Sequence, residues 1–92
     1  MTFQKGHKLS VGRPDKKMTI AAYSVEGFVE DPDGNHKSFN IYRWKNVLKS
    51  TDEIKGKTSK DYVFVRSCYK FRTAKRVLMN FATKKPIPKQ FL

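Results

Sequence analysis

The feature of the sequence that most constrains the fold is the segment Asp-Pro-Asp-Gly-Asn at residues 31–35, which separates two alternating runs of polar and apolar residues. Proline sets φ near the value that a β-turn requires, and glycine and asparagine accept positive φ. Residues 18–30 and residues 36–45 each show the period of two that is typical of a strand. The sequence therefore predicts a β-hairpin, with a bulge or bend at Gly27 in its longer strand.

A third strand and one helix are predicted after this hairpin. Residues 62–71 are rich in aromatic and β-branched side chains, which favour a strand. Residues 73–83 carry apolar side chains three and four positions apart, as in a helix that packs on a sheet. Thr73 is the predicted N-cap, and Pro86 prevents the helix from continuing. Residues 46–60, before the third strand, are predicted to form a loop with one helical turn. The predicted buried stripe of the helix is Ala74, Val77, Leu78 and Phe81.

The length of 92 residues is about enough for one domain. Residues 1–17 contain glycine, proline and basic residues without a strand or helix period, so they are predicted to form a flexible arm. Residues 18–85 form the predicted domain, and residues 86–92 form an extended tail. The predicted class is α+β: a three-stranded antiparallel sheet with one C-terminal helix packed on one face, preceded by a flexible basic N-terminal arm.

The charge of the chain is strongly positive and unevenly distributed. Lys and Arg number 20 against 8 Asp and Glu, which gives a net charge of +12. Residues 18–35 contain acidic residues and no Lys or Arg, whereas no acidic residue follows Asp61. A surface of this kind attracts polyanions and orients their approach. The charge therefore predicts a nucleic acid or an acidic protein as the partner.

Few residues in the chain could support catalysis or bind a metal. Cys68 is the single cysteine, and His7 and His36 are the two histidines. A catalytic cysteine needs a base within reach, and a zinc site needs four ligands. The sequence has no glycine-rich phosphate-binding loop, and Asp31 and Asp33 are explained as turn formers. We therefore expect a protein that is not an enzyme and that has no metal or other cofactor.

The same composition predicts where the protein works. A single cysteine cannot form an intramolecular disulfide, which is typical of proteins in a reducing compartment. No apolar run approaches the roughly 20 residues of a membrane helix, and no apolar stretch follows the basic amino terminus. We expect an intracellular protein, in the cytoplasm, nucleoid or nucleus, without a membrane partner.

The two faces of the predicted sheet differ in character. Side chains alternate along a strand, so each predicted strand sends every second residue toward the helix. The other face then combines aromatic and basic side chains, which suit base stacking and phosphate contacts. The alternative is that the chain termini or a second copy of the protein cover this face. The predicted helix-facing residues are Phe39, Ile41, Val63 and Val65, and the predicted members of the other face are Asn40, Tyr42, Trp44, Tyr62, Phe64, Arg66 and Lys70.

Basic residues also gather around the predicted helix. Arg72 and Arg76 are four positions apart and therefore share one helix face, opposite the apolar stripe. Such a face can lie along phosphates or enter a major groove. The alternative is an ordinary solvated helix face. The predicted basic cluster comprises Arg72, Lys75, Arg76, Lys84 and Lys85.

The predicted arm contains the tripeptide Gly12-Arg13-Pro14 among further basic residues. Glycine permits close backbone approach, proline keeps the chain extended, and arginine favours a narrow groove of negative potential. The tripeptide resembles the core of an AT-hook, a family of short unstructured motifs that bind the minor groove of A·T-rich DNA. It departs from that pattern at Val11, where the family has an arginine. The alternative is a plain basic tail.

Together, these features predict a non-enzymatic nucleic-acid-binding protein, with duplex DNA favoured over RNA. Two alternatives remain open: a small interaction or inhibitor protein that docks on an acidic protein, and an RNA-binding module associated with the ribosome. The sequence points to no particular oligomeric state. The residues predicted to bind nucleic acid are Arg13, Lys16, Lys17, Tyr42, Arg43, Trp44, Lys45, Arg66, Lys70, Arg72, Lys75, Arg76, Lys84 and Lys85.

Overall fold

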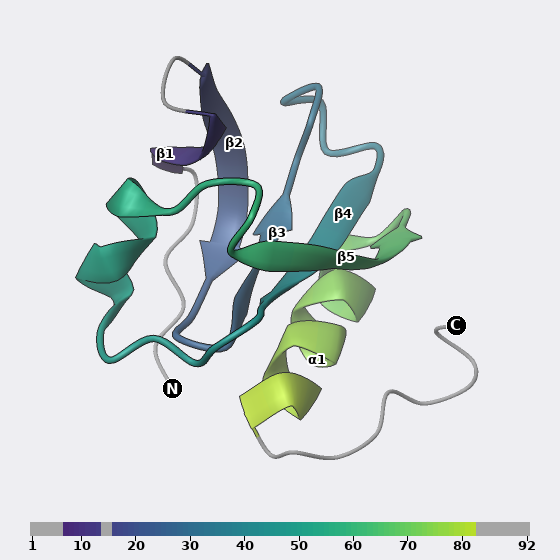
Figure 1. Ribbon diagram of the computed structural model, residues 1–92. Helices are drawn as coiled ribbons and strands as arrows, with labels where there is room; N and C mark the ends of the chain where they lie inside the picture. Colours follow the sequence, from purple (N-terminus) through teal and green to yellow (C-terminus); the bar gives the residue numbers. More distant parts are fainter. Residues whose placement is uncertain (1–6, 14–15, 83–92) are drawn as a thin grey trace.

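The structure is a computed structural model that describes residues 7–13 and 16–82. In these residues the fold is α+β, as predicted: an antiparallel sheet carries one C-terminal helix (Figure 1). The prediction of three strands is wrong, because the described sheet has five, in the order β1-β2-β3-β4-β5, and each strand pairs with its neighbours in the sequence. The strands are β1 (His7–Arg13), β2 (Lys16–Tyr23), β3 (Gly27–Glu30), β4 (Phe39–Trp44) and β5 (Tyr62–Cys68), and the helices are the 3₁₀ helix η1 (Thr51–Gly56) and α1 (Phe71–Ala82).

The predicted hairpin around residues 31–35 is present between β3 and β4. The two strands pair in antiparallel register, with Glu30 opposite Asn40 next to the connecting loop. Gly34 in this loop has a φ of 70°, and its N–H donates to the carbonyl of Asp31 at 3.2 Å. Glycine adopts positive φ without steric cost. The turn therefore rests on local residue chemistry, as the sequence indicated.

The prediction of one strand over residues 18–30 is wrong, because the chain turns back at Ser24 and forms both β2 and β3. The Ser24 N–H donates to the carbonyl of Gly27 at 2.8 Å, and the Ser24 hydroxyl accepts the N–H of Glu26 at 3.2 Å. Serine hydroxyls stabilise turns in this way. The predicted bulge or bend at Gly27 is also wrong, because the chain bends at residues 25–26 and Gly27 begins β3 in regular register with Arg43. A Cβ on Gly27 would collide with the carbonyl of Tyr42, so the glycine permits close backbone approach.

The prediction of a flexible arm is wrong for residues 7–13, which form β1 and pair with β2. Leu9 and Val11 are the only apolar side chains of this segment, too few for a strand period to stand out. Val11 is nevertheless completely buried, and the carbonyl of Gly12 accepts the N–H of Ser59 at 2.7 Å. The parts of the predicted arm and tail that lie outside the described residues are 1–6, 14–15 and 86–92.

Helix α1 packs on one face of the sheet through the predicted stripe (Figure 1). It begins at Phe71, and a hydrogen bond from the Ala74 N–H to the Lys70 carbonyl at 3.1 Å closes its first turn. The predicted N-cap at Thr73 is therefore wrong, and β5 ends earlier than predicted, at Cys68. The buried cluster under the helix comprises Ala21, Ala22, Val29, Phe39, Ile41, Cys68, Ala74, Val77, Leu78 and Phe81.

A second buried cluster lies on the opposite face of the sheet. Phe28 belongs to it, whereas the adjacent Val29 belongs to the cluster under the helix, as expected for neighbours in one strand. The cover on this side comes from β1 and from the connection between β4 and β5, where η1 lies beside β1 (Figure 1). The predicted loop at residues 46–60 does contain one short helix, and it contributes Leu48 and Ile54 to the core. The members of the second cluster are Val11, Met18, Ile20, Phe28, Trp44, Leu48 and Ile54.

Candidate nucleic-acid interface

The aromatic side chains of the sheet are mainly core residues and not a surface for base stacking. Trp44 is 3% exposed, and its indole N–H donates to the carbonyl of Ser24 at 3.2 Å. The ring of Phe28 packs against it at a centroid distance of 5.0 Å and against Tyr42 at 4.9 Å. The prediction that Trp44 contacts nucleic acid is wrong, because Val11 of β1 and Leu48 and Ile54 of the connection between β4 and β5 pack with it in the second cluster.

The alternation had predicted that Arg66 and Tyr42 share one sheet face, but in the structure they lie on opposite faces. Tyr42 lies opposite Phe64, but the preceding residue Ile41 lies opposite Arg66, so Val65 is an extra residue in β5. Residues directly opposite each other in an antiparallel pair project to the same face. A bulge of one residue therefore moves Arg66 to the face that carries Ile41, under the helix. Val65 packs against that same cluster, as predicted.

Arg43 and Lys45 flank the end of β4 on the surface. The guanidinium of Arg43 lies 5.2 Å from the ring centroid of Phe81, a cation–π contact that holds it at the junction of sheet and helix. Lys45 is exposed, and its backbone N–H donates to the carbonyl of Asp61 at 2.9 Å. Both side chains are thus accessible to a ligand, and that of Arg43 lies at the edge of the helix layer.

A group of exposed cationic side chains lies at and around the start of α1. Lys70, Arg72 and Arg76 are exposed, and we call these three residues the helix cluster. Within the described residues, none of the three lies within ion-pair distance of a carboxylate. Arg72 and Arg76 are one turn apart on the side of α1 away from the sheet, whereas Lys75 is half-buried on its flank. The helix face predicted from the sequence is therefore present.

Several predicted binding residues have no described side chain. The backbone of Arg13 pairs with that of Lys16 where β1 meets β2, and Lys17 lies in β2. Lys84 and Lys85 lie outside the described residues. These five positions stay predictions.

The resemblance to an AT-hook does not hold in the fold. An AT-hook is unstructured before it enters a minor groove, but Gly12 belongs to β1 and is buried. Its φ of 101° departs from the extended conformation, and a Cβ here would lie 3.0 Å from the hydroxyl of Tyr62. Gly12 therefore allows β1 to approach the side chain of Tyr62 closely.

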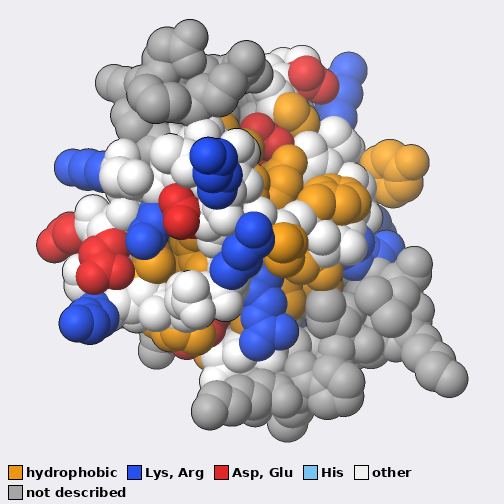
Figure 2. Space-filling model, in the orientation of Figure 1, with side chains coloured by type: hydrophobic (Ala, Val, Ile, Leu, Met, Phe, Trp, Pro, Cys, Tyr) orange, Lys and Arg blue, Asp and Glu red, His pale blue; other side chains and the backbone are white. Residues whose placement is uncertain are grey.

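A partly apolar surface lies along β5. This strand is at one edge of the sheet, and among the described strands it pairs with β4 alone. Phe64 is 57% exposed, Val63 is also exposed, and Tyr69 beyond the end of the strand is 84% exposed. Figure 2 shows hydrophobic side chains at the surface over β5, with Lys and Arg side chains beside them. Val63 had been predicted to face the helix, but the helix does not cover it.

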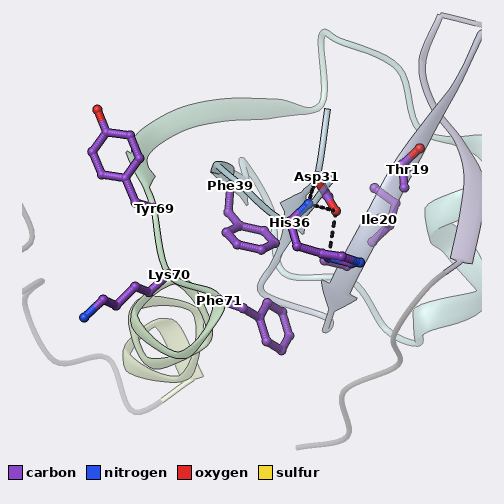
Figure 3. Close-up of a pocket in the computed structure, with 9 residues that line it drawn as sticks. Thr19, Ile20, Asp31, His36, Phe39, Tyr69, Lys70 and Phe71 are labelled. Atoms are coloured by element: carbon purple, nitrogen blue, oxygen red, sulfur yellow. Dashed lines mark hydrogen bonds and ion pairs between the residues drawn. The ribbon is translucent and has the colours of Figure 1, made fainter. Parts of the chain in front are cut away.

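A cavity of about 560 Å³ lies between the loop that joins β3 to β4 and the corner that joins β5 to α1 (Figure 3). We call it the corner cavity. Its inner wall is apolar, and Tyr69 and Lys70 line it from the side of the corner. Sequence analysis missed this site because its residues come from four separate segments. The inner lining residues include Ile20, Ala21, Asp31, His36, Phe39 and Phe71.

One wall of the corner cavity is an Asp31 and His36 pair. Asp31 is 2% exposed, and its Oδ2 lies 3.0 Å from Nδ1 of His36. The backbone N–H of His36 also donates to both carboxylate oxygens, at 3.4 and 3.3 Å. These bonds hold His36 at a φ of 59°, in the left-handed region that histidine adopts more readily than most side chains. Asp31 is therefore more than a turn former, because it fixes both the backbone and the ring of His36.

A smaller cavity of about 320 Å³ opens beside the second cluster, where Glu30 meets Tyr42 and Tyr62. The Tyr42 hydroxyl donates to Oε1 of Glu30 at 3.3 Å, and the Asn40 amide donates to the same oxygen at 3.1 Å. Burial, and next the negative charge of Glu30, raises the pKa of Tyr42 to about 12. Tyr42 thus acts as a hydrogen-bond donor that stays protonated at neutral pH.

The Cys68 thiol, which was considered for catalysis, is not activated. Burial raises the pKa of the Cys68 thiol, and the protonated thiol is a poor nucleophile. Within residues 7–13 and 16–82, no three His, Cys, Asp or Glu side chains are placed to share a metal ion. The described helices are also too short or too polar to cross a membrane.

Comparisons with protein-family models, with curated proteins and with solved structures each find no match to this chain.

Proposed function

We propose that the protein binds nucleic acid through the helix cluster and that it does so without catalysing a reaction. The observation that carries this proposal is the exposure of Lys70, Arg72 and Arg76 without a carboxylate partner in the described residues. Exposed cations without a carboxylate partner attract a polyanion, and binding releases its condensed counterions. The net charge of +12 adds a long-range attraction of the same sign.

The shape of the site favours duplex DNA over RNA. Helix α1 presents two arginines one turn apart on its outer side, and the major groove of B-DNA admits an α-helix. The major groove of an RNA helix is too deep and narrow for side chains to read. Arg43, at the edge of the helix layer, can add a phosphate contact.

The first prediction concerns the salt dependence of this binding. We expect the double variant Arg72→Ala and Arg76→Ala to weaken duplex binding and to reduce the slope of log K against log salt by about 2, because each lost phosphate contact removes about 0.9. Fluorescence anisotropy with a labelled duplex at several salt concentrations measures both quantities.

The matched control is the double variant Lys49→Ala and Lys55→Ala, which removes the same charge from exposed positions near η1. This control should keep the wild-type slope. Equal losses in both double variants would show that net charge alone drives binding. Wild-type affinity without the two arginines would remove α1 from the binding surface.

A second candidate function is docking on an acidic protein, and the edge strand β5 favours it. An exposed edge offers unpaired backbone groups to a strand of another chain, and Val63 and Phe64 add exposed apolar side chains. An acidic protein that copurifies after nuclease treatment, and that is lost in Phe64→Ser but retained by the Arg72 and Arg76 double variant, would support this candidate over nucleic acid.

A further inference from the structure

We propose that the corner cavity holds one unpaired nucleobase of a nucleic acid whose phosphates contact the helix cluster. This inference rests on the proposed function and adds to it a preference for nucleic acid with an unpaired base, such as a bulge, a loop or a single strand. Phosphate contacts by exposed arginines alone would give no such preference, because every nucleic acid carries phosphates.

The walls of the corner cavity suit a flat aromatic ligand. Phe39 and Phe71 lie with ring centroids 5.5 Å apart, and the ring of His36 lies 6.4 Å from that of Phe39. Figure 3 shows these three rings near one another, with Ile20 to one side on β2. The volume of about 560 Å³ is within the range of roughly 300 to 1,000 Å³ that is typical of ligand pockets. Aromatic side chains bind bases of any identity by stacking. Phe39 is only 1% exposed, so the ring that can stack on a base is that of His36, which is 77% exposed.

His36 adds a polar contact at a fixed position. Its Nδ1 is engaged by Asp31, so the neutral ring has its hydrogen there and leaves Nε2 as an acceptor. The ring is 77% exposed, and nothing in the described residues bonds to Nε2. An N–H group on the edge of a base can therefore donate to it. Because buried Asp31 holds the ring before any ligand arrives, little side-chain freedom is lost on binding.

The cavity and the helix cluster are continuous along the chain. Phe71 lines the cavity, and the residues on either side of it, Lys70 and Arg72, are cations of the helix cluster. Figure 3 shows Lys70 extending away from the three rings, toward the outside. A base next to Phe71 would thus have its own phosphates at the level of Lys70 and Arg72. An uncharged apolar ligand would leave these cations unused.

Pairing state decides whether a base can enter. A base inside a duplex must leave the stack at a cost in free energy, whereas a bulged or single-stranded base is already free. The second prediction is therefore that the protein binds a duplex with one bulged base about tenfold more tightly than the same duplex fully paired, as one aromatic stack allows.

The test uses the full chain and two labelled duplexes, one fully paired and one with a single bulged 2-aminopurine. We expect tenfold tighter binding of the bulged duplex and quenching of the 2-aminopurine fluorescence on binding. His36→Asn should abolish both, because asparagine tolerates the same backbone conformation but has no ring. Phe71→Leu should reduce both while retaining an apolar side chain under the helix. Circular dichroism checks that each variant is folded.

The controls separate this inference from the proposed function. The Arg72 and Arg76 double variant should weaken binding to both duplexes equally and keep the tenfold ratio. If the wild type binds both duplexes equally and His36→Asn changes neither, the cavity inference is wrong and the proposed function stands. If the wild type binds neither duplex, the proposed function itself is wrong. Binding of free adenosine monophosphate that His36→Asn removes, without a preference for the bulge, would overturn the inference in favour of a nucleotide ligand.

Discussion

At the scale of single residues, Tyr42 shows how burial and a neighbouring charge act together on one group. Its pKa is raised to about 12, whereas an unfolded tyrosine ionises near 10. The unfolded chain therefore loses this proton first as the pH rises. The contribution of Tyr42 to stability is complete below about pH 10 and is lost as the pH rises from there through about 12.

The third prediction follows from this difference. We expect Tyr42→Phe to show a smaller fall in the free energy of unfolding between pH 9 and pH 11.5 than the wild type, because phenylalanine has no proton to lose. At neutral pH the same variant should be destabilised by about 1 kcal/mol, the contribution of the lost hydrogen bond to Glu30. Denaturant titrations at each pH measure both effects.

The matched control is Tyr69→Phe, which removes a hydroxyl from a tyrosine that is 84% exposed. It should follow the wild-type curve at every pH. An alkaline fall of the same size in Tyr42→Phe and in the wild type would show that other groups, such as Tyr62 with its own raised pKa, dominate this range.

Single residues also show which features the sequence period can predict and which it cannot. The turn chemistry of Gly34 acts on its own neighbours, so the sequence was sufficient to predict it. The bulge at Val65 depends on the partner strand β4, and one extra residue was enough to move Arg66 to the other face. The prediction for Trp44 was wrong for a similar reason, because residues distant in the sequence cover it.

At the scale of elements, β1 changes the interpretation of the amino-terminal segment most. A basic segment with Leu9 and Val11 as its apolar side chains becomes a strand because β2 pairs with it and the second cluster accepts Val11. Deletion of a flexible arm would leave the domain intact, but deletion of residues 7–13 should destabilise it. It removes an edge of the sheet and part of the core.

The fourth prediction tests β1 by a smaller change. We expect Val11→Ala to lower the free energy of unfolding by about 2 kcal/mol, because a completely buried side chain is truncated and a cavity is left. The matched control Val47→Ala truncates an exposed valine in the loop after β4 and should change the free energy of unfolding by less than about 0.5 kcal/mol. Equal stability of the two variants in urea titrations would mean that β1 does not belong to the cooperative core.

Elements that carry their own period were predicted, and elements that depend on a partner were not. Helix α1 has its buried stripe in the sequence, so its position was predicted to within two residues at its start. The connection between β4 and β5 has Leu48 and Ile54 six positions apart among polar residues, without any period. Their burial follows from packing against residues of β1, β2, β3 and β4 in the second cluster, which only the complete fold brings together. The corner cavity could not be predicted from the sequence for the same reason.

At the scale of the whole molecule, one sheet separates two buried clusters that share strands. Strand β3 contributes Val29 to the cluster under α1 and Phe28 to the second cluster, and β4 contributes Ile41 and Trp44 in the same way. Loss of either cluster exposes one face of these strands, so neither cluster can persist without the other. A chain of this size is also expected to unfold in one cooperative step.

The fifth prediction is that two separate probes report the same unfolding transition. Trp44 is the single tryptophan and lies in the second cluster, so its fluorescence reports on that side of the sheet. Circular dichroism at 222 nm reports mainly on α1, on the other side. We expect both signals to change at the same guanidinium concentration, because the shared strands couple the two sides.

Core variants on each side make this test sharper. Leu78→Ala removes packing under the helix and should lower stability by about 3 kcal/mol, whereas Ile54→Val affects the second cluster and should lower it by about 1 kcal/mol. In a cooperative molecule each variant shifts both signals by the same amount. If Leu78→Ala shifted the dichroism alone and left the Trp44 transition in place, α1 would be a separately melting layer on a sheet that the second cluster holds together. The helix cluster would then be able to detach from the sheet, and the corner cavity, which needs Phe71 beside Phe39, would exist only while the helix is docked.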